Sequence, residues 1–134
     1  MWPSFTKFRI ALRWWSAGVF RFPRNLGFAS GQLISHFSDH AGDFSATTES
    51  EYEALADRFL NKPKTSQMHE CSRLKGGDRV RFDKVTNEFG VVSPGGVIRS
   101  YYIPIPCASL PLGRPKIRCH KLPTNLDYVI ATCK

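Results

Sequence analysis

One histidine and a group of arginines are the residues of this sequence whose types suit chemistry on an anionic substrate. His40 can accept or donate a proton near neutral pH, because histidine titrates in that range without strong perturbation. Arg79, Arg81 and Arg99 lie on predicted adjacent strands, and guanidinium groups can hold a phosphate through paired hydrogen bonds. Proton transfer beside a bound phosphate is the chemistry that these residues indicate.

Two further residues have side chains that suit the same substrate. Ser100 and Tyr102 are two positions apart, so they share one face of a predicted strand and can both hydrogen-bond a phosphate. Tyr102 can instead stack on a base.

His36 lies four residues before His40, on the same face of a predicted helix, and we interpret it as a partly buried structural histidine. The sequence contains no zinc motif and no Walker loop, so we expect neither a metal nor a cofactor.

The strands that must position these residues are predicted between residues 66 and 104. Residues 78–83 alternate apolar and charged side chains, and residues 88–92 and 97–103 are rich in β-branched and aromatic residues. A turn around Asn87 and the turn Pro94-Gly95-Gly96 join them, and connections this short make neighbouring strands antiparallel. Residues 66–75 are expected to add a fourth strand.

Two helices are predicted before these strands. Residues 31–45 contain a short helix that ends near Gly42. Residues 48–61 give a stronger pattern, because Thr48 and Glu51 form a capping box ahead of apolar residues at helical spacing. We therefore predict an α+β domain over residues 31–105, with two N-terminal helices packed on a roughly four-stranded antiparallel meander.

The two ends of the chain carry the positive charge. Residues 1–38 contain five Lys or Arg and no Asp or Glu, residues 39–103 have a net charge of −1, and residues 104–134 have a net charge of +4. We predict that residues 1–30 are a basic N-terminal extension. Its apolar stripe at helical spacing suits an organelle transit peptide, a membrane-surface helix or a helix packed on the domain. No convincing secretory signal or membrane-spanning run is present.

The C-terminal part is predicted to be a second basic extension, residues 106–134. Five prolines after the last predicted strand argue against a continuing sheet, although residues 127–133 could add one short strand. The chain contains four cysteines without a C-x-x-C pair, so we interpret them as unpaired thiols or a tail disulfide rather than a zinc site. They are Cys71, Cys107, Cys119 and Cys133.

Two stretches of the sequence resemble a group of small bacterial toxin-type ribonucleases. The first is HFSDHAGDFSATTESEYEALADRFL, residues 36–60, and the second is DRVRFDKVTNEFGVVSPGGVIRSYYIP, residues 78–104. The resemblance extends over about residues 33–104. These ribonucleases have a motif close to H-x-x-K-H-G-x-x-F-G, a helix of the E-Y-x-x-x-A-x-x-F kind and a meander that ends in I-R-T-[FY]. They belong to the barnase, EndoU, colicin and RelE-like fold, in which helices precede an antiparallel sheet.

The resemblance implies a role for each matched residue. His40 would be the general acid or base, Arg81 or its neighbour Arg79 would contact the scissile phosphate, and Ser100 would replace the family's strand threonine. Asn87 would shape the turn or touch RNA. The list of expected site residues is completed by Arg99 for substrate binding and by Tyr102. The implied reaction is metal-independent cleavage of RNA, in which the substrate's own 2′-hydroxyl attacks the adjacent phosphate and leaves a cyclic phosphate.

The resemblance also implies partners and a place of action. We expect RNA, including tRNA, as the substrate, a cognate inhibitor protein as a partner and the cytoplasm as the place of action. Residues 1–30 are a candidate for contact with a membrane surface. Asp39 stands where the family often has a lysine, which inverts the local charge. The alternative functions are a non-catalytic module on the same fold that binds RNA or an anionic surface, and an organelle-targeted protein from which residues 1–30 are removed.

Overall fold

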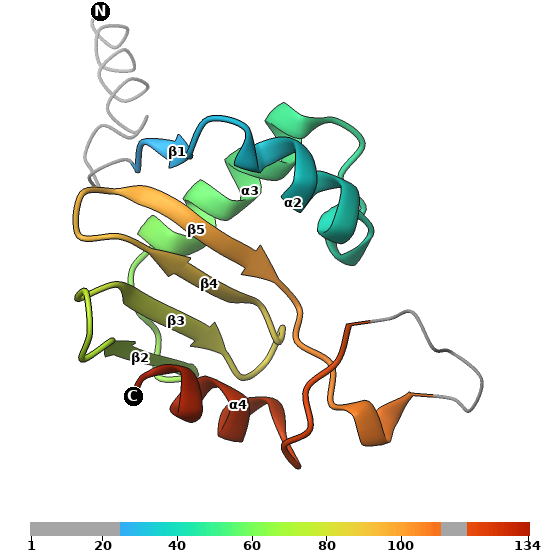
Figure 1. The fold of residues 1–134 in the computed structure, drawn as a ribbon, viewed down its shortest axis with the longest axis vertical. Helices are drawn as coiled ribbons and strands as arrows, with labels where there is room; N and C mark the ends of the chain where they lie inside the picture. Colours follow the sequence, from blue (N-terminus) through green and yellow to red (C-terminus); the bar gives the residue numbers. More distant parts are fainter. Residues whose placement is uncertain (1–24, 111–117) are drawn as a thin grey trace, which may run out of the picture.

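A five-stranded mixed sheet with helices on both faces forms the body of the protein (Figure 1). The computed structural model describes residues 25–110 and 118–134. The strand order is β1-β5-β4-β3-β2. The elements in chain order are β1 (Gly27–Phe28), α2 (Gln32–His40), the 3-10 turn η1 (Ala41–Phe44), α3 (Glu49–Asn61), β2 (Met68–Ser72), β3 (Arg79–Asp83), β4 (Phe89–Val92), β5 (Val97–Tyr102), the 3-10 turn η2 (Cys107–Ser109) and α4 (Asn125–Thr132).

The predicted meander is present in strands β2 to β5, each antiparallel to the next. Both predicted turn signals are confirmed. Asn87 has φ 66° between β3 and β4, and Gly96 has φ 94° between β4 and β5. Because β3 and β5 both run antiparallel to β4, the end of β5 and the turn at Asn87 lie at the same end of the sheet. The cleft described below is located at this end.

A fifth strand corrects the predicted count of four. β1 pairs with β5 in parallel, with Gly27 opposite Val97 and Phe28 opposite Ile98. The strand is only two residues long, too short for an alternating pattern in the sequence. Tertiary contacts hold it, because the Phe28 amide donates to Glu53 of α3 at 2.9 Å and the Phe28 ring is buried in the core.

Helix α3 begins at the predicted cap. The Thr48 hydroxyl accepts the Glu51 amide at 3.1 Å, as the capping box requires. The Glu51 carboxylate accepts the amide of Thr47 at 2.7 Å, one residue earlier than in the standard box. Four residues at helical spacing bury this helix against the sheet: Tyr52, Ala56, Phe59 and Leu60.

The two faces of the sheet have separate cores. Helices α2 and α3 cover one face, where the fully buried side chains include Tyr52, Leu60 and Tyr101. Helix α4 covers the other face, where Val129 packs with Val80. Residues on both sides of the predicted domain 31–105 therefore take part in packing, β1 before it and α4 after it.

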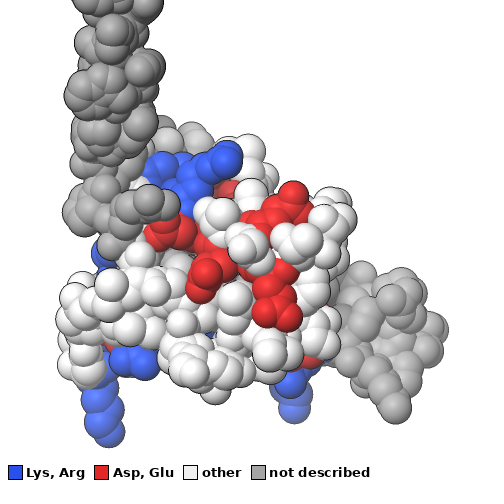
Figure 2. All heavy atoms as spheres, turned by 90° about the horizontal axis from the view of Figure 1, so that it is seen from above, with Lys and Arg blue, Asp and Glu red and all other residues white. Residues whose placement is uncertain are grey.

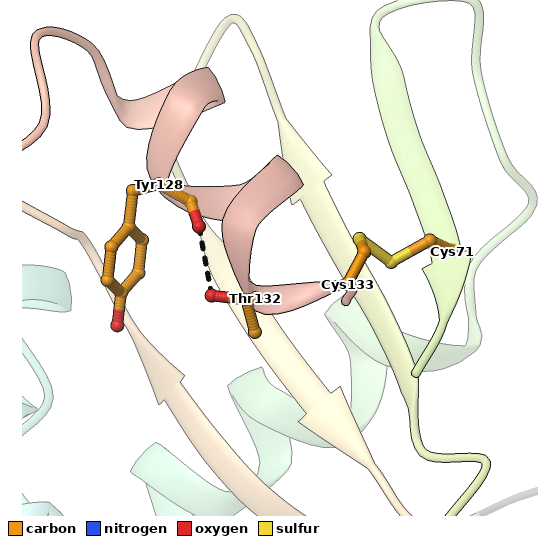
Figure 3. The surroundings of a disulfide bond; sticks show 4 residues. All are labelled: Cys71, Tyr128, Thr132 and Cys133. Atoms are coloured by element: carbon orange, nitrogen blue, oxygen red, sulfur yellow. Dashed lines mark hydrogen bonds between the residues drawn. A yellow bond between two sulfur atoms is a disulfide. The ribbon is translucent and has the colours of Figure 1, made fainter. Parts of the chain in front are cut away.

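Helix α4 replaces the short strand predicted for residues 127–133. Its cap is local, since the Thr124 hydroxyl accepts the Asp127 amide at 3.1 Å. Val129 is fully buried, and the Thr132 hydroxyl donates to the carbonyl oxygen of Tyr128 at 2.9 Å (Figure 3). The apolar residues that suggested a strand instead form one face of a two-turn helix.

Two disulfides join the C-terminal part of the chain to itself and to the sheet. Cys107 pairs with Cys119, which confirms the interpretation of a tail disulfide. Cys71 of β2 pairs with Cys133, just after α4 (Figure 3). The prediction of unpaired thiols is therefore wrong, because all four cysteines are bonded.

The amphipathic helix predicted near the N-terminus lies among residues 1–24, outside the described residues. In the part of the chain that the structure describes, no helix has the length and apolar character needed to cross a membrane.

Candidate active site

A cleft of about 670 Å³ opens at the end of the sheet where β5 terminates. Its walls come from α2, η1, the last residues of β5, residues 103–105, residues 118–120 and α4. The lining side chains whose types suit chemistry on an anion are His36, His40, Ser100, Tyr102, Arg118, His120 and Tyr128. The cleft thus brings the predicted residues His40, Ser100 and Tyr102 together.

His40 is the last residue of α2, and its ring lies against Tyr102. The two rings are stacked, with centroids 4.8 Å apart and an angle of 20° between their planes. The His40 side chain is only 15% exposed, and this burial lowers its pKa below the ordinary value of 6.5. The Asp43 carboxylate, 3.8 Å from Nδ1, opposes that shift. His40 is therefore a neutral imidazole at pH 7 and can accept a proton.

Asp43 also fixes the corner that carries His40. Its Oδ2 accepts the backbone amide of Ile103 at 3.1 Å, immediately after β5 ends. This bond ties the turn η1 to the strand that carries Tyr102. This hydrogen bond thus helps to hold the His40 ring over Tyr102.

Tyr102 belongs to a pair of hydrogen-bonded phenols. Its hydroxyl lies 2.5 Å from the hydroxyl of Tyr128 on α4. Burial and this hydrogen bond raise the pKa of Tyr102 far above its usual value, so the phenol stays neutral. The ring of His120 stacks on Tyr128 with centroids 4.6 Å apart. Two histidine–tyrosine stacks are therefore joined through the tyrosine hydroxyls.

The orientation of His120 follows from its neighbours. The side-chain nitrogen of Asn125 donates to Oδ1 of Asn87 at 3.1 Å, which leaves the Asn125 oxygen to accept from Nε2 of His120 at 2.8 Å. Nε2 then carries a hydrogen, and Nδ1 is buried without a hydrogen-bond partner. Asn87, predicted to shape the turn or touch RNA, shapes the turn and also supports this wall of the cleft through Asn125.

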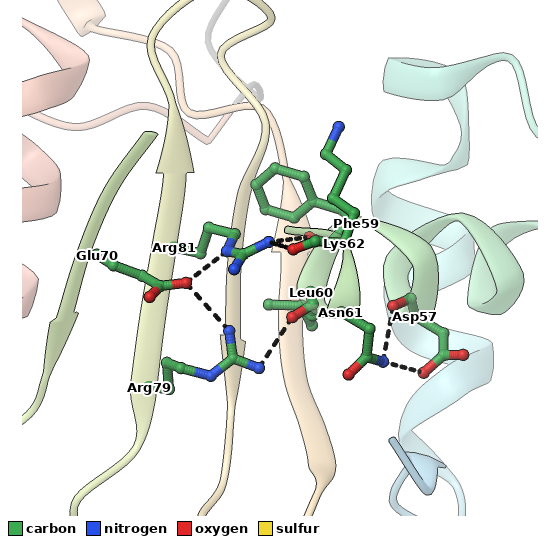
Figure 4. A network of polar contacts seen from close by, with 8 residues as sticks. All are labelled: Asp57, Phe59, Leu60, Asn61, Lys62, Glu70, Arg79 and Arg81. Carbon is green, nitrogen blue, oxygen red and sulfur yellow. Dashed lines mark hydrogen bonds and ion pairs between the residues drawn. The ribbon is translucent and has the colours of Figure 1, made fainter. Parts of the chain in front are cut away.

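Arg79 and Arg81 lie away from the cleft, against the end of α3 (Figure 4). Arg81 is buried, and its guanidinium bonds Glu70 at 2.6 Å and the carbonyl oxygens of Phe59 and Lys62. The same Glu70 oxygen accepts from Arg79 at 3.2 Å. Both arginines point to the α3 face because they alternate with buried residues that point to the α4 face.

Arg99 also lies away from the cleft. Its Nε is 2.9 Å from the Asp78 carboxylate, which also pairs with Arg73. β4 separates the strand of Arg99 from that of Arg79 and Arg81, so the expectation of adjacent strands is wrong. None of these three predicted phosphate-binding arginines lines the cleft that contains His40.

Four of the residues that sequence reasoning missed come from the C-terminal part. Arg118, His120, Asn125 and Tyr128 lie in the segment that was predicted to be an extension. One local signal for it existed, since Thr124 precedes Asp127 by three residues, the spacing of a helix cap. The approach of this segment to His40 depends on disulfide pairing, which sequence spacing alone does not determine.

Metal ligation has no support in the described residues, 25–110 and 118–134. No group of three or more His, Cys, Asp or Glu side chains among them is arranged to hold a metal ion. His36 and His40 share a helix face as predicted, with ring centroids 6.2 Å apart, and the His36 ring also contacts the Phe28 ring in a tilted arrangement with centroids 5.1 Å apart. A comparison with known protein families finds no model that matches this chain, and a comparison with curated proteins finds no match either.

Proposed function

We propose that this protein is a metal-independent endoribonuclease of toxin type and that the cleft is its active site. One observation supports this proposal most strongly. His40, a neutral imidazole, is stacked on Tyr102 in the same cleft as Ser100. These are three of the residues to which the resemblance assigned catalytic roles.

The chemistry begins with the 2′-hydroxyl of the RNA. His40 accepts the hydroxyl proton while the 2′-oxygen forms a bond to the adjacent phosphorus. The bond from phosphorus to the 5′-oxygen breaks, and the leaving oxygen takes a proton from water. The products are a 2′,3′-cyclic phosphate and a free 5′-hydroxyl. Ser100 and the neutral phenol of Tyr102 supply hydrogen bonds to the phosphate oxygens.

Cleavage of total RNA and of tRNA in the presence of EDTA tests this function. We expect the wild-type protein to cut and to leave cyclic phosphate ends, and His40→Ala to lose about 10²- to 10⁴-fold of the rate. His69→Ala is the matched control, since His69 lies on β2 and outside the lining of the cleft. Equal cleavage by the wild-type protein and by His40→Ala would contradict the role of His40.

A folded wild-type protein that does not cut any RNA would contradict the nuclease function. The remaining proposal would then be the non-catalytic module that binds RNA or an anionic surface. The carboxylates of Asp39 and Asp43 near His40 oppose a phosphate in the cleft, so such a module would bind the polyanion through the basic ends of the chain. A titration with RNA at several salt concentrations would then measure the binding directly.

The disulfides bear on the place of action. Disulfides form in oxidising compartments and are rare in the cytoplasm. We therefore propose that the protein folds under oxidising conditions and acts on cytoplasmic RNA after transfer.

A cognate inhibitor would cover the cleft in the producing cell. Co-purification with a protein that blocks cleavage would identify such an inhibitor.

A further inference from the structure

We infer that Arg118 is the residue that binds the scissile phosphodiester in the cleft, an assignment that rests on the proposed function. Cleavage at phosphorus builds negative charge that a nearby cation must stabilise. Arg118 lines the cleft together with His40, Ser100 and Tyr102. Among the described residues that form its lining, Arg118 is the single Lys or Arg. The cation that the strand arginines were expected to provide therefore comes from the C-terminal segment.

The backbone beside Arg118 is fixed at the rim of the cleft. The next residue, Cys119, is bonded to Cys107. The amide of His120 donates to the carbonyl oxygen of Ile105 at 3.0 Å, and the amide of Cys107 donates to the carbonyl oxygen of His120 at 2.8 Å. The long side chain extends from this anchored point and is 81% exposed, so it is accessible to a ligand.

The distribution of charge directs an RNA chain to this side of the cleft. Residues 32–61, which include α2 and α3, contain six Asp or Glu and one Arg. Figure 2 shows acidic side chains grouped on the face seen from above, on the side of these helices. The described residues 118–134, by contrast, contain three Lys or Arg and one Asp, a net charge of +2. A polyanion is repelled by the helical side and attracted by the segment that carries Arg118.

The partner of Arg118 in the free protein is weakly held. Its guanidinium lies 3.7 Å from the Asp39 carboxylate, beyond the range of a strong hydrogen bond, and the Asp39 side chain is 43% exposed. An exposed ion pair of this kind contributes little to stability. A phosphate can therefore displace Asp39 and take two parallel hydrogen bonds from the guanidinium.

Binding of a non-cleavable RNA tests the assignment without depending on cleavage. The probe is a fluorescent 2′-O-methyl oligoribonucleotide of mixed sequence, titrated at several salt concentrations. We expect Arg118→Ala to bind roughly tenfold more weakly, and the magnitude of the salt slope to fall by about 0.7 because one phosphate contact is lost. Arg118→Lys keeps the charge but loses the paired geometry, so we expect an intermediate affinity.

Cleavage of tRNA by the same variants separates the two proposals. We expect Arg118→Ala to lose about a hundredfold in kcat/KM. Lys75→Ala, which removes one charge from the exposed β2–β3 turn at the opposite end of the sheet, should match the wild-type protein. Wild-type cleavage with an unaffected Arg118→Ala variant would overturn the assignment and leave the nuclease function intact. A wild-type protein that binds the probe but does not cut would overturn the nuclease function, and with it this assignment.

The variant Asp39→Asn provides a second, independent measurement. If a phosphate must displace Asp39 from Arg118, Asp39→Asn should tighten binding of the 2′-O-methyl probe. In an Arg118→Ala background the same substitution should have a smaller effect, since no guanidinium remains to be released. Equal effects of Asp39→Asn in the two backgrounds would show that Asp39 does not act through Arg118, and would contradict the displacement of the ion pair.

Discussion

Two arginines, Arg81 and Arg118, lie in different parts of the molecule and differ in how firmly their guanidinium groups are bound. Arg81, on the α3 face, has a side chain that is 6% exposed and bonds a carboxylate and two backbone carbonyl oxygens (Figure 4). Arg118, at the cleft, is 81% exposed and faces one carboxylate at 3.7 Å. The first guanidinium is committed to the fold, whereas the second is accessible to a ligand.

The end of α3 explains why the strand arginines are committed. The last carbonyl groups of a helix have no partners within it, and the helix dipole makes this end partly negative. Arg79 donates to the carbonyl oxygen of Leu60 at 2.9 Å, and Arg81 donates to the carbonyl oxygens of Phe59 and Lys62. The carboxylate of Glu70 forms an ion pair with each of the two arginines. A phosphate could reach Arg81 only by breaking these bonds.

The largest effect that we expect from this comparison is the loss of stability in Arg81→Ala. Removing the buried guanidinium leaves Glu70 without its closest partner and leaves the carbonyl oxygens of Phe59 and Lys62 without their donor. We expect the free energy of unfolding to fall by about 4 kcal/mol. Urea denaturation followed by circular dichroism measures this loss.

The neighbouring Arg79→Ala is the matched control for Arg81. Its side chain is 35% exposed, so we expect the free energy of unfolding to fall by only about 1 kcal/mol.

Under conditions where Arg81→Ala remains folded, its cleavage of tRNA per folded molecule should equal that of the wild-type protein. A selective loss of activity in a stable Arg81→Ala variant would instead support the expected role of Arg81 at the phosphate.

The second effect concerns the disulfide that holds α4 to the sheet. The double variant Cys71→Ser/Cys133→Ser opens a link between residues separated by 62 positions, and we expect a stability loss of about 3 kcal/mol. α4 carries Tyr128, whose hydroxyl bonds Tyr102. This variant should therefore lose cleavage as well as stability, unlike Arg81→Ala. Urea denaturation and tRNA cleavage at low temperature measure both quantities.

The other disulfide provides the control for that variant. Cys107→Ser/Cys119→Ser opens a link of only 12 positions, so its stability loss should be smaller. Because Cys119 follows Arg118 directly, this variant should weaken binding of the 2′-O-methyl probe while α4 stays attached. If both double variants lost stability but kept full cleavage, the C-terminal segment would not contribute to the active site.

The sequence predicted the local parts of the fold well. Alternation in residues 78–83 and the turn at Asn87 identified the meander, and Thr48 with Glu51 identified the start of α3. Each of these features is set by neighbours in the chain. Alternation also showed that Arg79 and Arg81 share one face, but it did not show that the end of α3 lies against that face.

The cleft was only partly predictable because it is assembled from distant segments. His40, Ser100 and Tyr102 were identified from residue type and from the resemblance. Tyr128 and Arg118 were not, since their position depends on a two-turn helix and two disulfides within a proline-rich segment. Nonlocal packing of this kind leaves no periodic pattern in the sequence.

The smallest expected effect is the dependence of stability on pH that arises from the cleft. Burial lowers the pKa of His40 below 6.5 in the folded protein, and it does the same for His36. Asp43, Asp39, His36 and Arg118 are the titratable groups that act on His40, and the two carboxylates oppose the shift without reversing it. The unfolded state therefore binds more protons than the folded state near pH 6, so stability rises with pH.

The sign of this effect gives a direct test with His36→Gln/His40→Gln. The contribution of the two histidines is present above pH 6.5 and is lost as the pH falls toward their folded-state pKa values. Between pH 7.5 and 5.5, the free energy of unfolding of the double variant should therefore fall less than that of the wild-type protein. For cleavage, the acidic limb of kcat/KM should have its midpoint below pH 6.5, because His40 must be neutral to accept the proton. A midpoint above 6.5 would mean that the essential base is a group other than the buried His40, and equal acid sensitivity of the two proteins would show that burial does not suppress protonation in this cleft.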